Sequence, residues 1–356
     1  MSADTVTPGP ASEPRQSLVT RRLPRWAPLV TAAGSIAAGI LIGLVAGLSS
    51  KIQWGLIAGV VHITVLHLWT SRVENSRQAK DRLATSIVWA CFVLAVVPLV
   101  SLMWYTVRKG VKVLDGYFLT HSMNGVLTIE EGGGVYHALI GTLEQIGLAT
   151  LIAVPIGLLT AVYLVEYGRG KPALAVTFFV DVMTGIPSIV AGLFVFSFWI
   201  VVLGFGFSGF AGSMALAILM MPIVVRSAEE MLRLVPNELR EAGLALGVPK
   251  WRTILKVVLP TAIGGITTGV MLAIARIAGE TAPVMLLVFG SQVINTNPFK
   301  DGQASLPFYI WEQYRLGNEP SYARAWAAAL VLITVVMALN LIARLIARWK
   351  APSAGR

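Results

Sequence analysis

Two charged residues stand four positions apart in a strongly apolar part of the chain. Arg276 and Glu280 belong to the segment RIAGETAP, residues 276–283. Residues four apart share one face of a helix, so the two side chains are predicted to lie one turn from each other. A guanidinium offers donors in a planar fork that matches two oxygens of an oxyanion, and it stays charged at every accessible pH. Glu280 would neutralise Arg276 when no anion is bound, and the hydroxyl of Thr281 lies beside it. The alternative is a structural pair that holds two helices together.

This pair lies in a chain whose composition is typical of a membrane protein. Of the 356 residues, 56% are hydrophobic and 13% are charged, and the apolar residues are gathered in long runs. A membrane-spanning helix needs about 20 mostly apolar residues. Eight runs are predicted to span the membrane: 26–48, 52–70, 84–106, 137–165, 173–203, 209–225, 261–290 and 323–347. An arginine inside a span normally faces the interior of a helix bundle and has a partner. Asp181 and Glu144 are further acids within spans, as partners for Arg276 or as residues near the membrane interface.

The positive charges indicate how these spans are oriented, because short cytoplasmic segments are enriched in Lys and Arg. Most of the 28 lysines and arginines lie near the N-terminus, at 72–82, at 169–171, at 226–256 and from 344 to the C-terminus. We therefore expect an even number of spans with both termini in the cytoplasm. This topology accounts for the net charge of +10, so we expect no nucleic-acid partner.

The composition also argues against several kinds of active site. Cys91 is the only cysteine, so no disulfide can form within the chain. The four histidines do not form a cluster with metal-ligand spacing. The sequence has no G-x-x-x-x-G-K-[ST] motif for nucleotide phosphates. We therefore expect no catalytic residue, metal site or cofactor in this chain, and any nucleotide hydrolysis must come from another chain.

A polar segment, EAGLALGVPKWRTILKVVLP, residues 241–260, separates two apolar runs. Glu241, Ala242 and Gly243 are predicted to open a short helix that Gly247 breaks. Pro249 starts a second helical segment, because proline at a helix start costs no hydrogen bond, and this segment is predicted to end at Leu259 and Pro260. The pattern predicts a helix–turn–helix across the membrane surface that a partner holds. The alternative is an amphipathic loop on lipid headgroups.

A second interruption falls inside the predicted span 173–203. In DVMTGIPSIVAGL, residues 181–193, a glycine and a proline interrupt an apolar run. Such a break is tolerated at membrane depth only where protein or a water-filled cavity satisfies the freed backbone groups. The residues Gly185, Pro187 and Ser188 are therefore predicted to form a helix break beside a transport path.

The glycine and Leu-Pro spacing of residues 241–260 resembles the EAA loop of ABC-importer permeases. Together with the segments at 181–193 and 276–283 and with GTLEQIGLATLIAVPIGLLTAVYLVEYG, residues 141–168, it resembles the phosphate-import permease family over roughly residues 83–348. The resemblance does not cover residues 1–72, and Gly243 stands where the EAA wording has a second alanine.

The resemblance implies a type I ABC importer permease fold and a set of partners. The EAA loop, residues 227–260, would be the coupling loop that docks on a separate ATPase subunit. The implied complex contains this chain and a PstC-like permease as a heterodimer, two copies of a PstB-like ATPase that binds ATP and Mg²⁺, and a PstS-like phosphate-binding protein. The expected substrate path contains Arg276, Glu280 and Thr281. The expected ATPase contacts come from Glu241, Ala242, Gly243, Gly247, Leu259 and Pro260.

The expected organisation places a six-helix core after an extra N-terminal hairpin. The predicted parts are a disordered cytoplasmic tail (1–25), a transmembrane hairpin (26–72), a cytoplasmic linker (73–83) and the permease domain (84–350). The chain is expected to span the plasma (inner) membrane of a prokaryote, in contact with lipid.

Other functions stay open at this point. A permease for sulfate, molybdate, another oxyanion or an amino acid would share the EAA loop. An ATP-independent secondary transporter has no use for such a loop. A membrane scaffold or receptor without transport has no use for an arginine and a glutamate inside a span.

Overall fold

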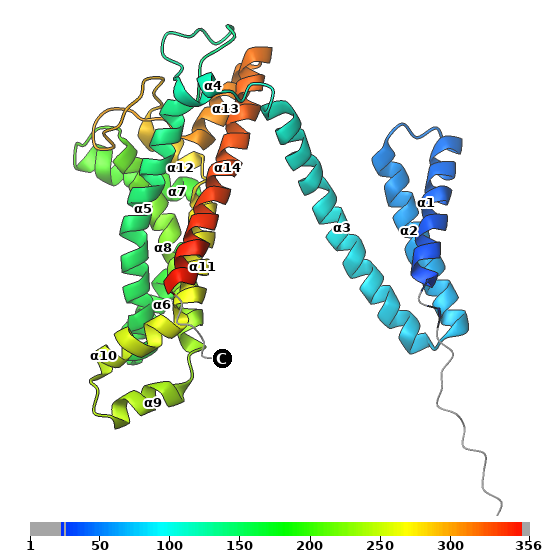
Figure 1. Ribbon diagram of the computed structural model, residues 1–356, viewed down its shortest axis with the longest axis horizontal. Coiled ribbons are helices and arrows are strands. Elements are labelled where there is room, and N and C mark those ends of the chain that lie inside the picture. The colour runs from blue at the N-terminus through cyan, green and yellow to red at the C-terminus, as the bar shows by residue number, and fades with distance from the viewer. Residues whose placement is uncertain (1–22, 25, 351–356) are drawn as a thin grey trace, which may run out of the picture. The chain divides into compact units, whose positions relative to one another are not determined.

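The computed structural model describes residues 23, 24 and 26–350 of the chain, and all regular elements in that part are helices (Figure 1). The chain forms two compact units that divide between Leu102 and Met103. The predicted N-terminal tail, 1–25, lies outside the described residues except at positions 23 and 24. The helices are α1 (Ala27–Val45), α2 (Lys51–Val73), α3 (Ser76–Gly110), α4 (Gly116–Thr120), α5 (Tyr136–Val162), η1 (Tyr163–Tyr167), α6 (Gly170–Thr184), α7 (Ser188–Val195), η2 (Phe196–Val202), α8 (Gly209–Arg233), α9 (Asn237–Ala245), α10 (Lys250–Thr253), η3 (Ile254–Val258), α11 (Leu259–Ile277), α12 (Ala282–Val288), α13 (Leu306–Leu316) and α14 (Glu319–Lys350).

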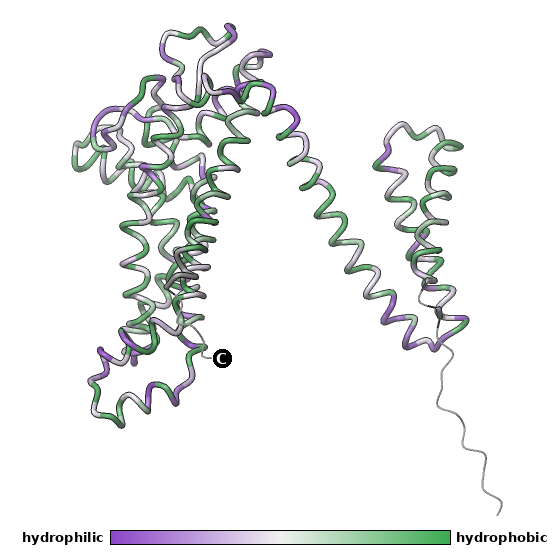
Figure 2. The backbone as a smooth tube through the Cα atoms, in the orientation of Figure 1, coloured by the Kyte–Doolittle hydropathy of each residue, from purple (hydrophilic) through white to green (hydrophobic). Residues whose placement is uncertain are grey.

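The prediction of an all-α protein with about eight spans is confirmed. In the described part of the chain, seven helices are long and apolar enough to cross a membrane, or eight if a bent pair is counted as one span. Hydrophobic residues follow the long helices, and hydrophilic residues gather toward their ends (Figure 2). In the second unit, α9 and α10 lie at one end and α4 and α13 at the other (Figure 1).

The run 173–203 is broken as predicted, since α6 and the α7–η2 helix meet at an angle of 107°. The run 261–290 was predicted as one span, but it is not one helix. Its helix begins earlier, at Lys250, and ends at Ile277, and the short α12 follows after a turn.

The first unit contains a hairpin in which α1 packs against α2 through small residues. Thr31, Ser35, Gly39 and Gly43 recur every fourth position and are buried. A Cβ atom at Gly43 would lie 2.2 Å from the Trp54 ring, so only glycine allows this approach. The segment 73–83, predicted as a linker, is helical except at positions 74 and 75.

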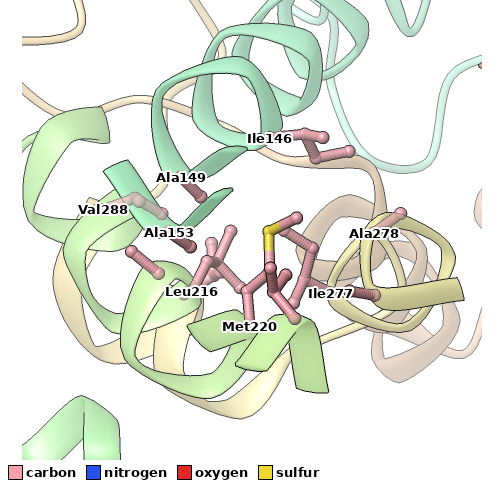
Figure 3. Close-up of a cluster of buried hydrophobic side chains, with 12 residues drawn as sticks. Ile146, Ala149, Ala153, Leu216, Met220, Ile277, Ala278 and Val288 are labelled. Atoms are coloured by element: carbon pink, nitrogen blue, oxygen red, sulfur yellow. The ribbon is translucent and has the colours of Figure 1, made fainter. Parts of the chain in front are cut away.

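The core of the second unit lies where α5, α8 and α11 pack together with α12 (Figure 3). Alanines at 149 and 153 of α5 face Leu216 and Met220 of α8, and Ile277 closes the cluster from α11. Small side chains let the helices approach closely. This packing fixes α5 and α8 to the end of α11, where the predicted anion site begins.

A further cluster fixes the α9–α10 end. Buried residues of α8, of the turn after it, of η3 and of α11 pack on Ala161 of α5: Ala228, Leu232, Val235, Val258, Ala262 and Ile266. The predicted coupling loop has two arms, α9 before Gly247 and α10 after it. The base of the first arm is therefore fixed by the end of α8, and the base of the second by η3.

Candidate functional site

The predicted pair Arg276 and Glu280 does not share a helix face. The helix α11 ends at Ile277, and Glu280 lies in the turn before α12. The reason is Pro283, which has no N–H to donate to the carbonyl of Gly279, four residues earlier, and whose ring would clash with that carbonyl in a continuous helix. The chain therefore breaks between the two charged residues.

The two side chains lie in different surroundings. Arg276 is exposed in this chain, and among the described residues it has no hydrogen-bond or ion-pair partner. Glu280 is partly buried and lines a cavity of about 10 Å³ together with Thr142, Gln145 and Ser305. A cavity of that volume holds about one water molecule. The hydroxyl of Ser305 is buried with no partner among the described groups, and apolar residues such as Leu216 and Ile277 complete the wall of the cavity.

One buried side chain joins the loop between α12 and α13 to α5. Gln303 is fully buried, and its Nε2 donates to Oε2 of Glu144 over 2.6 Å. Its Oε1 accepts from Nε2 of Gln145 over 2.9 Å. Glu144 therefore holds this loop and is not a partner of Arg276.

Gly141 of α5 allows the close packing of α5 against the α12–α13 loop to be tested. A Cβ atom at Gly141 would lie 2.1 Å from the carbonyl oxygen of Ala304, whereas a Cβ atom at Gly147 of the same helix would meet nothing within 4 Å. We expect Gly141→Ala to lower the free energy of unfolding by about 1–3 kcal/mol through overpacking. Gly147→Ala should be neutral or stabilising, since alanine favours helix. Thermal unfolding in detergent measures both, and equal melting temperatures for the two variants would contradict the close packing.

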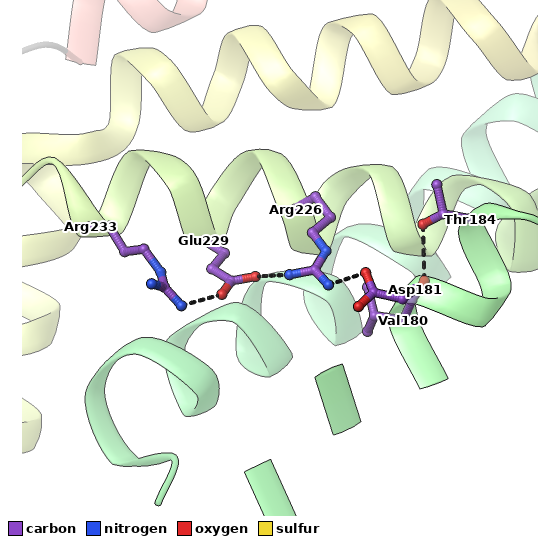
Figure 4. Close-up of polar contacts among 6 residues, drawn as sticks. All are labelled: Val180, Asp181, Thr184, Arg226, Glu229 and Arg233. Carbon is purple, nitrogen blue, oxygen red and sulfur yellow. Dashed lines mark hydrogen bonds and ion pairs between the residues drawn. The ribbon is translucent and has the colours of Figure 1, made fainter. Parts of the chain in front are cut away.

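The predicted helix break is present at the expected residues. The helix α6 ends at Thr184, Gly185 and Pro187 form the turn, and Ser188 begins α7. One turn before the break, Asp181 forms an ion pair with Arg226 of α8 (Figure 4). Asp181 is therefore not a partner of Arg276.

The sequence did not predict that Arg226 lies beside the helix break. Its Nη1 donates to Glu229 over 2.8 Å, and Glu229 also accepts from Arg233 over 2.7 Å (Figure 4). The side chain of Glu229 is 7% exposed, whereas that of Asp181 is 59% exposed. The predicted span ended at 225, so Arg226 was assigned to a loop, although α8 continues to Arg233.

The predicted helix–turn–helix is present, with different bounds. The first helix, α9, begins at Asn237 and not at Glu241, and Gly247 has a left-handed φ of 74° in the turn. The second helix does not end at Leu259 and Pro260 but continues through them into α11. The π-helical segment η3, Ile254–Val258, directly precedes Leu259 and Pro260, so the helix changes its hydrogen-bond pattern next to the proline and does not stop there.

The coupling loop presents apolar side chains that this chain leaves uncovered. Leu244 and Leu246 of the first arm and Trp251 of the second are exposed, Leu246 by 82%. Gly243 packs against Thr253, because a Cβ atom there would lie 2.8 Å from Cγ2 of Thr253. The two arms therefore touch each other, and their outward sides carry apolar groups that suit a protein partner.

Comparison with known proteins finds a matching family and several similar proteins. Residues 153–354 match the family described as "Binding-protein-dependent transport system inner membrane component". The chain is 52% identical over 271 residues to "Phosphate transport system permease protein PstA 1" of Mycobacterium tuberculosis (strain ATCC 25618 / H37Rv), which covers 76% of this chain and 88% of the relative. It is 39% identical over 271 residues to "Phosphate transport system permease protein PstA" of Yersinia pestis, which covers 76% of this chain and 90% of the relative.

A solved structure supports the fold. A chain of the "bacterial alginate ABC transporter in complex with alginate pentasaccharide-bound periplasmic protein" superposes with a TM-score of 0.54 at 16% identity, over 76% of this chain and 95% of that chain. At this identity the similarity concerns the fold alone, and it confirms the arrangement of helices expected for an ABC importer permease.

Proposed function

Since this chain belongs to the family of phosphate transport system permease proteins named PstA, we propose that inorganic phosphate crosses the membrane along a path bordered by Arg276 and Glu280. The chain is the permease subunit of a phosphate ABC importer and a multi-pass protein of the inner membrane. The observation that carries this function is the identity of 52% to a phosphate permease over 76% of the chain.

The proposed path uses an arginine that this chain leaves free. Arg276 is exposed and has no partner among the described residues, and an unpaired guanidinium within a membrane is costly. A phosphate with two oxygens facing the fork would neutralise it. Glu280, in the wall of the small cavity, would accept the proton of a protonated phosphate, and Thr281 would add a hydroxyl nearby.

Arg226 is proposed as a second contact for the anion, beside the helix break formed by Gly185, Pro187 and Ser188. Its guanidinium is shared between Asp181 and Glu229. Asp181 is mostly exposed and Glu229 is buried, so an entering phosphate would displace Asp181 more readily. Asp181 lies in α6. Replacement of Asp181 by phosphate at Arg226 would therefore connect the passage of the anion to the position of α6.

The exposed apolar groups of the coupling loop support docking on an ATPase. We expect Glu241, Ala242, Gly243 and Gly247 to lie at that contact, with Leu259 and Pro260 at its base. The complex would contain a PstC-like permease as a heterodimer partner, two copies of a PstB-like ATPase that bind ATP and Mg²⁺, and a PstS-like binding protein.

The excess of Lys and Arg near the α9–α10 end supports a cytoplasmic position for that end and for both termini.

Complementation of a deletion strain tests the proposed function. A strain that lacks its own phosphate permease subunit is expected to regain uptake of radiolabelled phosphate when it expresses this chain. Restored uptake of sulfate, molybdate or an amino acid, without phosphate, would assign the chain to another importer. Uptake in the absence of the ATPase would instead indicate a secondary transporter.

The N-terminal hairpin is expected to be dispensable for the path. Deletion of residues 1–72 removes two spans together and leaves Arg77, Lys80 and Arg82 at the start of α3, so the topology of the rest should be preserved. We expect phosphate uptake at a reduced level, measured against the amount of inserted protein. Complete loss of uptake by a stably inserted truncation would make the hairpin part of the mechanism.

A further inference from the structure

Glu166 contacts both arms of the coupling loop. It lies in η1, at the end of the span that α5 begins, and its side chain is only 5% exposed. Its carboxylate accepts from Nε of Arg240 in α9 over 2.9 Å. Its backbone carbonyl accepts from the ammonium group of Lys250 in α10, and that ammonium lies 4.8 Å from the centre of the Tyr167 ring. Glu166 therefore meets α9 through its buried carboxylate and α10 through its backbone carbonyl.

Arg240 extends the connection to a second span. Its Nη2 donates to the carbonyl of Leu232 over 2.8 Å, and its Nη1 donates to the carbonyl of Val235 over 2.5 Å. The carbonyl of Leu232 lies in the last turn of α8, where carbonyl groups have no partner within the helix, and that of Val235 lies in the turn that follows. One guanidinium thus joins α9 to the ends of both α5–η1 and α8.

The contact between Glu166 and Arg240 lies beside a gap in the packing. A cavity of about 130 Å³ lies beside the ion pair, with Leu244, Thr253 and Ile254 in its walls. The hydroxyl of Thr253 is buried with no partner among the described groups. Packing beside the ion pair is therefore incomplete, and the polar contacts of Arg240 add to the apolar cluster around Ala161 in joining the loop to the span.

The same helix reaches the proposed anion site. Residues 136–167 form one continuous helix, and Thr142 and Gln145 near its start line the cavity that Glu280 also lines. At 1.5 Å per residue, Glu166 is ~36 Å along the helix from Thr142. A displacement applied to the helix at Glu166 would thus reach the wall of the Glu280 cavity.

We propose that the Glu166–Arg240 ion pair is a latch that makes α5 move with the coupling loop, so that Glu166 is a positioning residue for the coupling of ATP hydrolysis to import. This inference rests on the proposed function as a phosphate importer. Without the latch, the ATPase would still dock on the loop and hydrolyse ATP, but its motion would not reach the anion path.

A reversible covalent tether tests the latch. In a Cys91→Ser background, which has no other cysteine, Glu166→Cys and Arg240→Cys are combined in the assembled complex with its ATPase, second permease and binding protein. Phosphate import and ATP hydrolysis are measured in proteoliposomes. We expect the import-to-hydrolysis ratio to fall by about tenfold or more, because the double variant removes the ion pair and hydrogen bond that join α9 to the end of the α5–η1 helix. A short, cleavable thiol-reactive cross-linker between the two cysteines should restore the import-to-hydrolysis ratio. Cleavage of the cross-linker should lower that ratio again.

Each other outcome contradicts the latch. An unchanged ratio in the double variant would show that the ion pair does not couple, and a ratio that cross-linking does not restore would show that its role is not that of a tether. Loss of the ATPase from the complex would make the pair a docking or folding contact. Glu131→Ala, which removes an exposed acid, serves as the control and should keep the wild-type ratio. If the phosphate assignment is wrong, the wild-type complex imports no phosphate, whereas failure of the latch alone leaves wild-type import intact.

Discussion

Arg276→Gln should reduce phosphate uptake by more than about 100-fold, because two hydrogen bonds from a charged group are worth ~3–6 kcal/mol together. Membrane insertion should be preserved, since loss of a charge makes a span easier to insert. Arg276→Lys keeps the charge but loses the planar fork, so partial uptake is expected. Uptake per inserted complex, measured with radiolabelled phosphate, distinguishes the three proteins. Arg108→Gln, which changes an exposed arginine of α3, should retain uptake.

A double variant separates the anion path from a structural pair. If Arg276 and Glu280 only held helices together, Arg276→Gln combined with Glu280→Gln would remove both charges and restore uptake. In the described part of the chain no hydrogen bond or ion pair joins the two residues, so we expect no recovery. Wild-type uptake by the double variant would defeat the assignment of Arg276 to the path.

Gly247→Trp should abolish the association of the ATPase while the protein stays inserted. Gly247 has a φ of 74°, and a Cβ atom there would meet nothing within 4 Å. The indole would therefore not clash within this chain, but it would project from the turn between the two arms. A non-glycine residue in the left-handed region also costs about 1–2 kcal/mol. Co-purification of the ATPase from detergent measures the effect, and a normal ratio of the two subunits would show that the loop does not dock there.

Two variants separate the bulk of the tryptophan from backbone strain. Gly204 has a φ of 72° and equally open surroundings outside the coupling loop, so Gly204→Trp imposes the same strain and should leave ATPase association normal. Gly247→Asn introduces a residue that tolerates the left-handed conformation, and it should keep most of the association. Equal losses in Gly204→Trp and Gly247→Trp would point to misfolding in place of docking.

The sequence predicted the features that depend on local chemistry. A bilayer requires long apolar helices, so the spans followed from the apolar runs. The break at Gly185 and Pro187 and the turn at Gly247 followed from residues whose backbone preferences are strong. The end of α11 was also accessible, because Pro283 lies four residues after Gly279. Apolar residues continue past this proline, which is why residues 261–290 were predicted to form one span.

The contacts between distant segments could not be predicted in the same way. Arg226 meets Asp181 across 45 residues, and Arg240 meets Glu166 across 74. Helical periodicity places side chains relative to others on the same helix, but it does not show which helices become neighbours. The angle of 107° at the broken span likewise results from packing of α7 against α8 and α12, which no local pattern specifies.

Anion accumulation by the reconstituted importer tests the proposed path most directly. Proteoliposomes would contain this chain with its PstC-like permease, its PstB-like ATPase and its PstS-like binding protein. We expect ATP-dependent accumulation of radiolabelled phosphate that excess sulfate or molybdate does not reduce, and no accumulation when this chain carries Arg276→Gln. Undiminished phosphate accumulation with Arg276→Gln, or accumulation of sulfate in place of phosphate, would contradict a phosphate path that depends on Arg276.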